Sequence, residues 1–348
     1  MKENGVRNIK KDLLTAGITL LILVLVVIGA GFGIDRLIHP GRKTGETDPS
    51  KETNGTEKTE VVSESETPRR AILDDEGNYV CKEQVSTYLF LGIDVTGPVK
   101  KNEGYINSGQ ADTQLVLVLD DEAKTRQMLQ LNRDSMVEMP VLGVMGEEVG
   151  YKKQQLALAH AYGDGMEGSC ENNVKTVSRL LGNQKIDGYY ALNMDGIGVI
   201  TEAIGGVEVT LESDYSAVDP EMVKGATMVL SGDRALRYLR SRKDVDDGTN
   251  QARMSRQRVF LNALQKKLGT VDSKTALIAF DEVQDYRVTD MGSKSMLTLL
   301  EKLKTYEDLG TKTIEGENTV DSEGHFCYNL DEESLTDVIM QLFYKVAE

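Results

Sequence analysis

The sequence has few of the residues from which many catalytic and metal centres are built. Its 348 residues include three cysteines, too few and too scattered for a disulfide scaffold or a CxxC metal site. The three histidines, His39, His160 and His325, are isolated from one another, and we expect His160 to have a structural role. No P-loop, HExxH or GxSxG pattern occurs. The sequence therefore offers no signature of a nucleotide-binding loop, a zinc protease or a serine hydrolase.

Positive charge is also scarce, but it is concentrated in one place. Lysine and arginine total 40 against 56 acidic residues, for a net charge of -16. General nucleic-acid binding needs a basic footprint, so we expect no nucleic-acid partner. Residues 234–258 nevertheless contain eight basic side chains, including seven of the sixteen arginines. Because a guanidinium group binds phosphate or carboxylate through two donors, this reversal of sign suggests an anion site. A solvated helix face is the alternative interpretation.

Only one long hydrophobic run is present, at residues 13–34. These 22 residues carry no charge and, as a helix, would reach roughly 33 Å, which is enough to span a bilayer core. No A-x-A-like cleavage site follows, so we expect a permanent single-pass anchor in the lipid bilayer rather than a signal peptide. Four basic residues precede the run, which favours a cytoplasmic N-terminus at residues 1–12 and an extracytoplasmic location for everything after the anchor.

The anchor is followed by a polar segment and then by a globular domain. Residues 40–70 contain only two apolar side chains, Val61 and Val62, and cannot bury enough surface to fold. We therefore expect a disordered extracytoplasmic tether at residues 35–79. Residues 80–348 alternate short apolar runs with amphipathic stretches, a pattern typical of an α/β domain, here with a C-terminal helical extension.

The apolar periodicity predicts the main elements of this domain. The predicted strands are residues 88–93, 114–119, 127–131, 189–192 and 207–211. The predicted helices are residues 154–162, 171–181, 196–204, 233–240, 255–268, 293–306 and 332–345. Ser231 is the predicted N-cap of the helix at 233–240, and Asp331 is the predicted start of the last helix.

Two aspartates flank the first two predicted strands. Asp94 directly follows the first, and Asp112 comes just before the second. If these strands pair, the two carboxylates meet at one edge of the sheet, where α/β sheets usually bind ligands. Two carboxylates together with substrate phosphate oxygens are a typical magnesium arrangement. Arg133 and Asp134 follow the third strand and would lie at the same edge. The alternative is that the two aspartates only form Asx turns.

The spacing within the arginine cluster predicts two sets of side chains. Arg240 and Arg242 point the same way if the chain is extended there. A helix places Arg253, Arg256 and Gln257 on one face, because they are at positions i, i+3 and i+4. Two converging sets of this kind could clamp a pyrophosphate. The other arginines fall on different faces, and we expect them to be solvated: Arg234, Arg237 and Arg258.

Seven motifs in order between residues 88 and 268 resemble the LytR-CpsA-Psr family: GIDVTG, ADT, NRD, LAHAYGDG, LNMDGIGVITEAIGGVEV, LSGDRALRYLRSRKD and ARMSRQR. Members of that family are membrane-anchored phosphotransferases that move a glycopolymer from a polyprenyl pyrophosphate carrier to peptidoglycan, using Mg²⁺. The resemblance implies a three-layer α/β/α sandwich with a central mixed sheet. It also implies a polyprenyl-pyrophosphate-linked glycopolymer and peptidoglycan as partners, and a cell-membrane location.

The resemblance also assigns roles to individual residues. It implies that Asp94 and Asp112 hold the metal. The residues it places on the pyrophosphate or its ligands are Arg133, Arg240, Arg242, Arg253, Arg256 and Gln257. Asp94, Arg133 and Asp134 are the catalytic candidates, with Asp94 or Asp134 as a hypothetical general base. The sequence departs from the family at Thr96 and Gln110, where arginine is common, so the phosphate clamp would be weaker on that side or the head group different.

Two other functions remain open from the sequence. Phosphoryl transfer requires positioning and charge neutralisation rather than a covalent nucleophile, which suits a site of arginines, aspartates and magnesium. A tethered polyanion-binding or regulatory protein of the cell envelope could use the same arginines without catalysis, and only turnover separates the two. A metal-dependent small-molecule hydrolase is less favoured because candidate metal ligands are sparse.

Overall fold

The computed structural model describes residues 79–347, except for positions 103, 106–107, 144, 242–244, 246–255, 257–258, 261–262, 265, 268–269, 272–274, 276–277, 280–281 and 323. The predicted anchor at 13–34 and the tether up to residue 78 lie outside this part. Within the residues described, no helix is long and apolar enough to cross a membrane.

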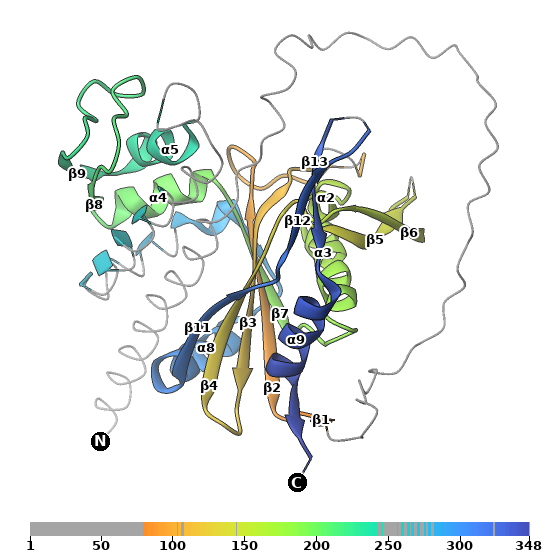
Figure 1. Cartoon of the computed structure of the whole chain (residues 1–348). Coiled ribbons are helices and arrows are strands. Elements are labelled where there is room, and N and C mark those ends of the chain that lie inside the picture. Colours follow the sequence, from red (N-terminus) through yellow and green to blue (C-terminus); the bar gives the residue numbers. More distant parts are fainter. Residues whose placement is uncertain are drawn as a thin grey trace, which may run out of the picture.

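A six-stranded mixed sheet forms the centre of the domain (Figure 1). Its strands, in spatial order, are β10 (Arg287–Thr289), β7 (Gly188–Asn193), β2 (Val85–Ile93), β3 (Ala111–Asp120), β4 (Thr125–Leu131) and β11 (Glu307–Thr313). The pairs β2–β7 and β4–β11 are parallel, and the other neighbours are antiparallel. The central mixed sheet expected from the family resemblance is therefore confirmed.

Helices cover both faces of this sheet, as its alternating side chains require. Leu89 and Leu91 belong to a core shared with α3 (Glu167–Leu180) and α9 (Glu332–Phe343). Phe90 points to the opposite core, which includes residues of α4 (Asp195–Ala203), α5 (Gly232–Arg240) and α8 (Ser293–Thr305). Because each face of the sheet has its own core, the three layers are helices, sheet and helices.

Four two-stranded sheets and two short helical segments complete the described fold. The paired strands are β1 (Tyr79–Cys81) with β14 (Tyr344–Val346), β5 (Met136–Leu142) with β6 (Glu148–Gln155), β8 (Val207–Thr210) with β9 (Thr227–Leu230), and β12 (Gly316–Val320) with β13 (Phe326–Leu330). The short segments are α2 (Leu158–Ala161) and the 3-10 helix η1 (Gln284–Tyr286).

All five predicted strands are present, as are the helices α3, α4, α5, α8 and α9. The helix predicted at 154–162 is wrong in its first part, because Gln154 and Gln155 pair with β5 and only residues 158–161 are helical. Asp331 caps α9 as predicted, since its carboxylate accepts from the Ser334 amide at 2.7 Å. Ser231 precedes α5 in an extended conformation, but its side chain forms no capping hydrogen bond. Within the helix predicted at 255–268, the described positions 256, 259–260, 263–264 and 266–267 are helical, and the other positions lie outside the described residues.

Candidate functional site

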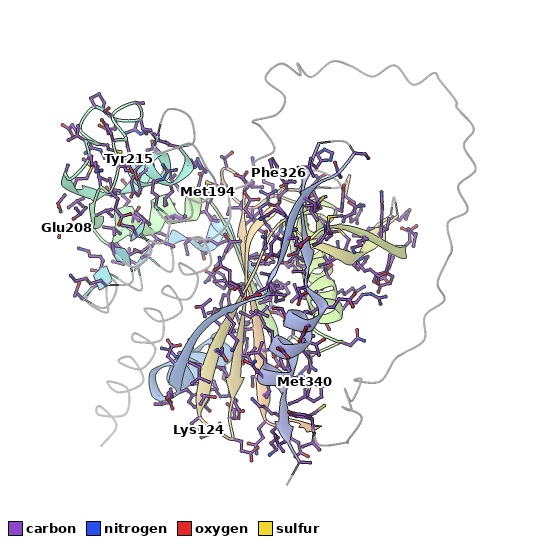
Figure 2. All side chains as sticks on the ribbon, viewed as in Figure 1. Lys124, Met194, Glu208, Tyr215, Phe326 and Met340 are labelled. Carbon is purple, nitrogen blue, oxygen red and sulfur yellow. The ribbon has the colours of Figure 1, made fainter. Side chains whose placement is uncertain are left out.

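The ends of β2 and β4 and the start of β3 lie at one end of the sheet, the end near Met194 and Phe326 and opposite Lys124 (Figure 2). Asp94 follows β2, is exposed, and donates its backbone amide to the Gln110 carbonyl at 2.9 Å. The β2–β3 register skips Asp112, which is the extra residue of a β-bulge between the Gly92 and Ile93 pairings. Bulges re-aim a side chain. The predicted meeting of these two strand ends at one edge is confirmed.

Arg133 connects the residues of this edge. Its Nη1 donates to Asp112 Oδ1 at 2.5 Å, and its Nη2 donates to Oε1 of Gln110. Its Nε lies 3.2 Å from Asp134 Oδ1. The Arg133 side chain is 10% exposed and that of Asp112 only 1%, so the pair is almost removed from water. Each charge therefore depends on the other for compensation.

The neighbouring strand β7 brings a third aspartate to the same edge. β7 runs parallel to β2 and pairs Asn193 with Ile93, and α4 begins two residues later at Asp195. One carboxylate oxygen of Asp195 accepts from the Gly97 amide at 2.7 Å, and the other accepts from Nη2 of Arg240. Through Asp195, Arg240 is thus linked by hydrogen bonds to the segment that follows Asp94. The structure brings this predicted arginine to the predicted edge.

Sequence reasoning missed Asp195, although the signal was present. It is an aspartate two residues after a buried strand and precedes glycine-containing sequence, much as Asp94 directly follows β2. Carboxylates in the first turn of a helix are also common for electrostatic reasons alone, so the signal is not specific without the contact to Arg240.

Arg256 does not lie where the sequence predicted. It is 2% exposed, and its guanidinium carbon stands 5.3 Å and 5.8 Å from the ring centroids of Tyr215 and Tyr238. It donates to the Ser241 carbonyl just after α5. This placement favours a structural role in holding the end of α5 over direct contact with a pyrophosphate. Three further candidates lie outside the described residues: Arg242, Arg253 and Gln257.

Arg234, which was expected to be solvated, is ion-paired, and its side chain is 31% exposed. Its Nε and Nη2 donate to the two carboxylate oxygens of Asp219 at 2.8 Å and 3.1 Å. These hydrogen bonds raise the pKa of Arg234 and lower that of Asp219. Arg237 is 56% exposed and 3.7 Å from the same aspartate, which agrees with the expected solvated position. Arg258 lies outside the described residues.

His160 is structural, as predicted. It is 2% exposed, and its Nδ1 hydrogen-bonds with the Gly109 carbonyl at 2.9 Å. Burial lowers the pKa of His160 to about 4, because the charged form would lose its hydration. Asp164, in the same motif, accepts from the amides of Met166 and Ser169 at the start of α3. The LAHAYGDG motif therefore fastens the segment before Asp112 to the helices beside it.

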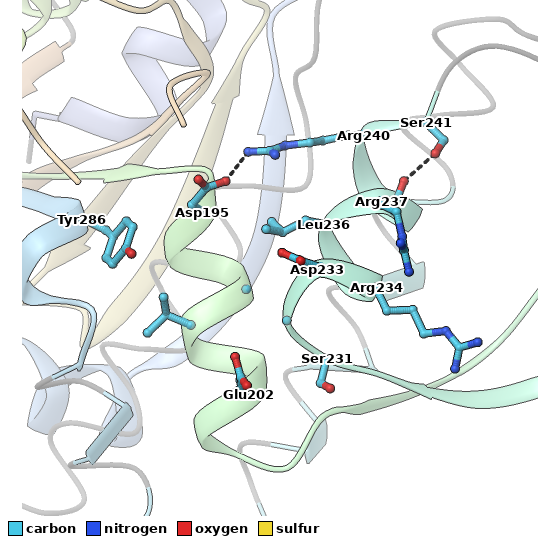
Figure 3. A pocket seen from close by; sticks show the side chains of 13 residues that line it. Asp195, Glu202, Ser231, Asp233, Arg234, Leu236, Arg237, Arg240, Ser241 and Tyr286 are labelled. Atoms are coloured by element: carbon cyan, nitrogen blue, oxygen red, sulfur yellow. Dashed lines mark hydrogen bonds and ion pairs between the residues drawn. The ribbon is translucent and has the colours of Figure 1, made fainter. Parts of the chain in front are cut away.

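Two cavities open near this edge. The larger, of about 780 Å³, lies over the outer face of α4, with Tyr286 on one side and α5 on the other (Figure 3). Asp195 and Arg240 line its end nearest the sheet. The smaller, of about 510 Å³, is lined by Asn193 and by the segment after Asp94. Its charged lining residues, among those that the structure describes, are Lys100 and Lys101.

The donor set at the edge fits magnesium that is completed by a substrate. Asp94 and Asp112 supply hard carboxylate oxygens, and Mg²⁺ is usually held by one or two carboxylates plus phosphate oxygens. Across the described ranges, no three or more histidine, cysteine or acidic side chains gather as a metal cage. Any magnesium at this edge would therefore need oxygens from bound phosphate or water.

Comparison with known proteins agrees with the family resemblance of the sequence motifs. The LytR_cpsA_psr family model matches residues 43–343. Biofilm regulatory protein A of Streptococcus mutans serotype c is 28% identical over 71% of this chain and 60% of its own length. The Enterococcus faecalis protein named polyisoprenyl-teichoic acid–peptidoglycan teichoic acid transferase TagU is 27% identical over 73% of this chain and 77% of its own length.

The fold also agrees with that of a solved crystal structure. The crystal structure of B. subtilis TagV superposes with a TM-score of 0.53 at 25% identity, covering 75% of this chain and 96% of that protein. The chain spans 60% of the length of the S. mutans relative, so what that whole protein does is not carried over directly. Because the family model covers most of the sequence and the fold agrees, the chain belongs to the LytR_cpsA_psr family.

Proposed function

We propose that this protein is a membrane-anchored, magnesium-dependent phosphotransferase that moves an anionic glycopolymer from a polyprenyl pyrophosphate carrier to peptidoglycan. Membership of the family supports the proposal, as does the teichoic acid transferase activity named for the E. faecalis relative. The observation that carries it is the gathering of Asp94, Asp112 and Arg133 at one edge of the sheet. Phosphoryl transfer needs such positioning and charge compensation.

The reaction we propose is a displacement at phosphorus. A sugar hydroxyl of peptidoglycan attacks the phosphorus that carries the glycopolymer. The bond from that phosphorus to the bridging oxygen breaks, and polyprenyl phosphate leaves. The hydroxyl proton passes to a base. Asp94 is the better of the two candidate bases because it is exposed, whereas Asp134 already faces Arg133.

Each residue of the edge has a part in this scheme. Asp94 and Asp112 are the residues that would hold magnesium, and the bound ion would neutralise charge on the phosphates. Arg240 faces the pyrophosphate from α5, and Asp195 orients it. Arg133 holds Asp112 and Gln110 in place as well as facing the substrate. We retain Arg242, Arg253 and Gln257 as further pyrophosphate ligands on the strength of the family resemblance.

The two departures from the family pattern have different consequences. Gln110 accepts a hydrogen bond from Arg133, so it takes part in positioning that arginine. An arginine at position 110 could not accept this bond. Thr96 lines the smaller cavity together with Lys100 and Lys101, so cationic charge is still present beside it. We infer that the clamp on this side is built from lysines and is less directional than a guanidinium fork.

The location we propose follows from the uncharged run at residues 13–34. A single helix there would keep the chain in the cell membrane, with residues 1–12 in the cytoplasm and the catalytic domain outside. The polar stretch at 35–79 would serve as the tether. This arrangement puts the domain on the side where peptidoglycan lies.

The second candidate function is that of a non-catalytic binding or regulatory protein of the cell envelope, which binds polyanions or lipid pyrophosphates. The name of the S. mutans relative, biofilm regulatory protein A, favours keeping it. Both functions require binding of an anionic substrate, so binding alone does not separate them. Turnover does, because a regulator forms no covalent product.

The experiment that tests the proposal is ligation by the full chain in detergent. The protein is incubated with a polyprenyl-pyrophosphate-linked anionic glycan and peptidoglycan fragments, with magnesium or with excess chelator. We expect a glycan–peptidoglycan product that forms with magnesium and is strongly reduced by the chelator. Binding of the lipid-linked glycan without any product would favour the regulatory alternative.

A further inference from the structure

The larger cavity extends well beyond Asp195 and Arg240, the two of its lining residues that the proposed pyrophosphate chemistry uses. It starts at Asp195 and Arg240 at the sheet edge and extends along α4 to Glu202, about two helical turns away (Figure 3). Its volume of about 780 Å³ lies within the usual range for small-molecule sites. A ligand in it would have one end beside the reacting edge and the other in solvent.

The floor of this cavity is apolar and close-packed. It is formed by Gly198, Val199 and Leu236, where α4 meets α5. A Cβ at position 198 would lie 2.9 Å from Leu236 Cδ1, so the Leu236 side chain would have to shift to accommodate it. The glycine therefore lets α5 approach α4 and leaves the helix surface without a protruding group. A flat apolar floor of this kind suits the C–H face of a sugar ring.

The rim of the cavity is polar and accessible. Glu202 and Asp233 are exposed, and neither forms an ion pair with a residue that the structure describes. Tyr286, half-buried, forms the opposite wall (Figure 3). Carboxylate oxygens accept hydrogen bonds from hydroxyl and amide groups, and an aromatic ring supplies apolar contact with a polar tip. These are donors and acceptors for a carbohydrate.

The charge of the rim disfavours the anionic glycopolymer, the other proposed substrate. Of the three arginines that line the cavity, Arg240 is paired with Asp195, and Arg234 with Asp219. Glu202 and Asp233 therefore face only Arg237 as a counter-charge within the described part of the cavity. An anionic polymer would meet repulsion here, whereas the smaller cavity presents lysines.

We propose that this cavity binds the acceptor, as a peptidoglycan glycan segment with free hydroxyl groups and no net negative charge on its sugars. Glu202 and Asp233 accept hydrogen bonds from its hydroxyl or amide groups, and Tyr286 and the floor contact its ring faces. The proposal rests on the proposed transferase function and deepens it. The two cavities sort acceptor from anionic donor by charge, on either side of one edge.

The test measures binding of a soluble peptidoglycan disaccharide–peptide fragment to the full chain in detergent, without any lipid-linked donor. Glu202→Gln and Asp233→Asn keep shape and remove charge. We expect each to weaken fragment binding by about tenfold, the loss of one charge-assisted hydrogen bond. The matched control is Glu208→Gln, an exposed glutamate on β8 that does not line the cavity, with an expected change below about twofold.

A second measurement separates this proposal from the function on which it rests. In the ligation assay, both cavity variants should raise the KM for the peptidoglycan acceptor and leave the KM for the lipid-linked donor unchanged. Fragment affinity equal to that of the unmodified protein in both variants would overturn the acceptor site even if transfer proceeds. Fragment binding that depends on Glu202 and Asp233, with no product under any condition, would support the site and remove the transferase function instead.

Discussion

An arginine–aspartate pair lies at each end of the central sheet, with Arg126 near the start of β4 and Arg133 just after its end, and the two pairs differ in kind. At the far end, Arg126 and Asp308 lie 2.9 Å apart, with side chains 29% and 57% exposed. At the site end, Arg133 and Asp112 lie 2.5 Å apart and are 10% and 1% exposed. The first pair is screened by water and contributes little, whereas the second has lost its hydration and depends on mutual compensation.

The surroundings of the two pairs differ in the same way. At the far end, Asp121 accepts from Lys302 at 2.6 Å and from the Tyr306 hydroxyl at 2.7 Å, so its charge is balanced. At the site end, Asp94 is exposed and forms no ion pair with any residue in the described ranges. The far end is a closed surface network, and the site end keeps a carboxylate available. This difference agrees with the transfer site proposed at that end.

The largest expected effect comes from Arg133→Ala. It removes the guanidinium group that pairs with the buried Asp112 carboxylate, and we expect a loss of about 3–5 kcal/mol in the free energy of unfolding. Arg126→Ala, the matched change at the far end, should cost less than about 1 kcal/mol. Chemical denaturation of the full chain measures both. Similar losses for the two variants would mean that the two ends do not differ.

A double variant sharpens this result. In Arg133→Gln with Asp112→Asn, neither charge of the buried pair remains, so stability should return to within about 1–2 kcal/mol of the unmodified protein. Ligation should not return, since the carboxylate and the guanidinium are both gone. Recovery of activity together with stability would show that the pair is structural only.

The position of the candidate site at one edge of the sheet could be predicted from the sequence, because it depends only on strand order and on the residues next to each strand. Asp94 and Asp112 flank strands that are strongly apolar, and neighbouring strands of this kind usually pair. The α/β class followed from the alternation of apolar runs with amphipathic stretches, and the mixed sheet followed from the family resemblance; both agree with the structure. The hairpin β5–β6 was missed because its outward-facing side chains are polar and glutamine-rich near Gln154 and Gln155, which weakens the two-residue periodicity.

Long-range pairings could not be predicted. Nothing in the local sequence of Arg234 indicates Asp219 as its partner, and nothing near Arg256 indicates that Tyr215 and Tyr238 lie beneath it. Helical spacing gives the face on which an arginine lies but not what that face meets. The cluster of arginines was therefore recognised correctly as unusual, while its members divide between ion pairing, burial and the cavity.

The second expected effect is a dependence of the free energy of unfolding on pH, carried by His160 at the site end of the sheet. The folded-state pKa of His160 is about 4, below its ordinary value of 6.5. Between these values the unfolded chain binds a proton that the folded chain does not. The free energy of unfolding should therefore fall by up to about 3 kcal/mol as pH drops from about 6.5 to about 4. The His160→Gln variant should not show this fall in the free energy of unfolding between pH 6.5 and 4.

The exposed histidine provides the control. His325 is 46% exposed and faces Asp321 at 3.1 Å, so His325→Gln should leave the slope between pH 6.5 and 4 nearly unchanged. Denaturation midpoints for the three proteins across this range give the comparison. Equal slopes for the unmodified protein and His160→Gln would show that His160 does not carry the pH dependence.

The smallest expected effect lies at the far end. Tyr306→Phe removes the hydroxyl that donates to Asp121, while Lys302 still faces that carboxylate. We expect a loss of about 1 kcal/mol in the free energy of unfolding and an unchanged ligation rate. In the unmodified protein, burial and the nearby Asp121 raise the pKa of Tyr306 to about 12. A reduced ligation rate in this variant would mean that the far end contributes to function.

The most direct test of the central claim is the ligation rate of Asp94→Asn in the full chain. The change preserves shape and removes one charge from an exposed side chain, so the unfolding free energy should stay within about 0.5 kcal/mol of the unmodified protein. We expect the rate at limiting magnesium to fall by about a hundredfold or more, because a metal-side oxygen is lost, while Asp308→Asn at the far end keeps the full rate. An unchanged rate in Asp94→Asn would contradict the assignment of this edge as the transfer site.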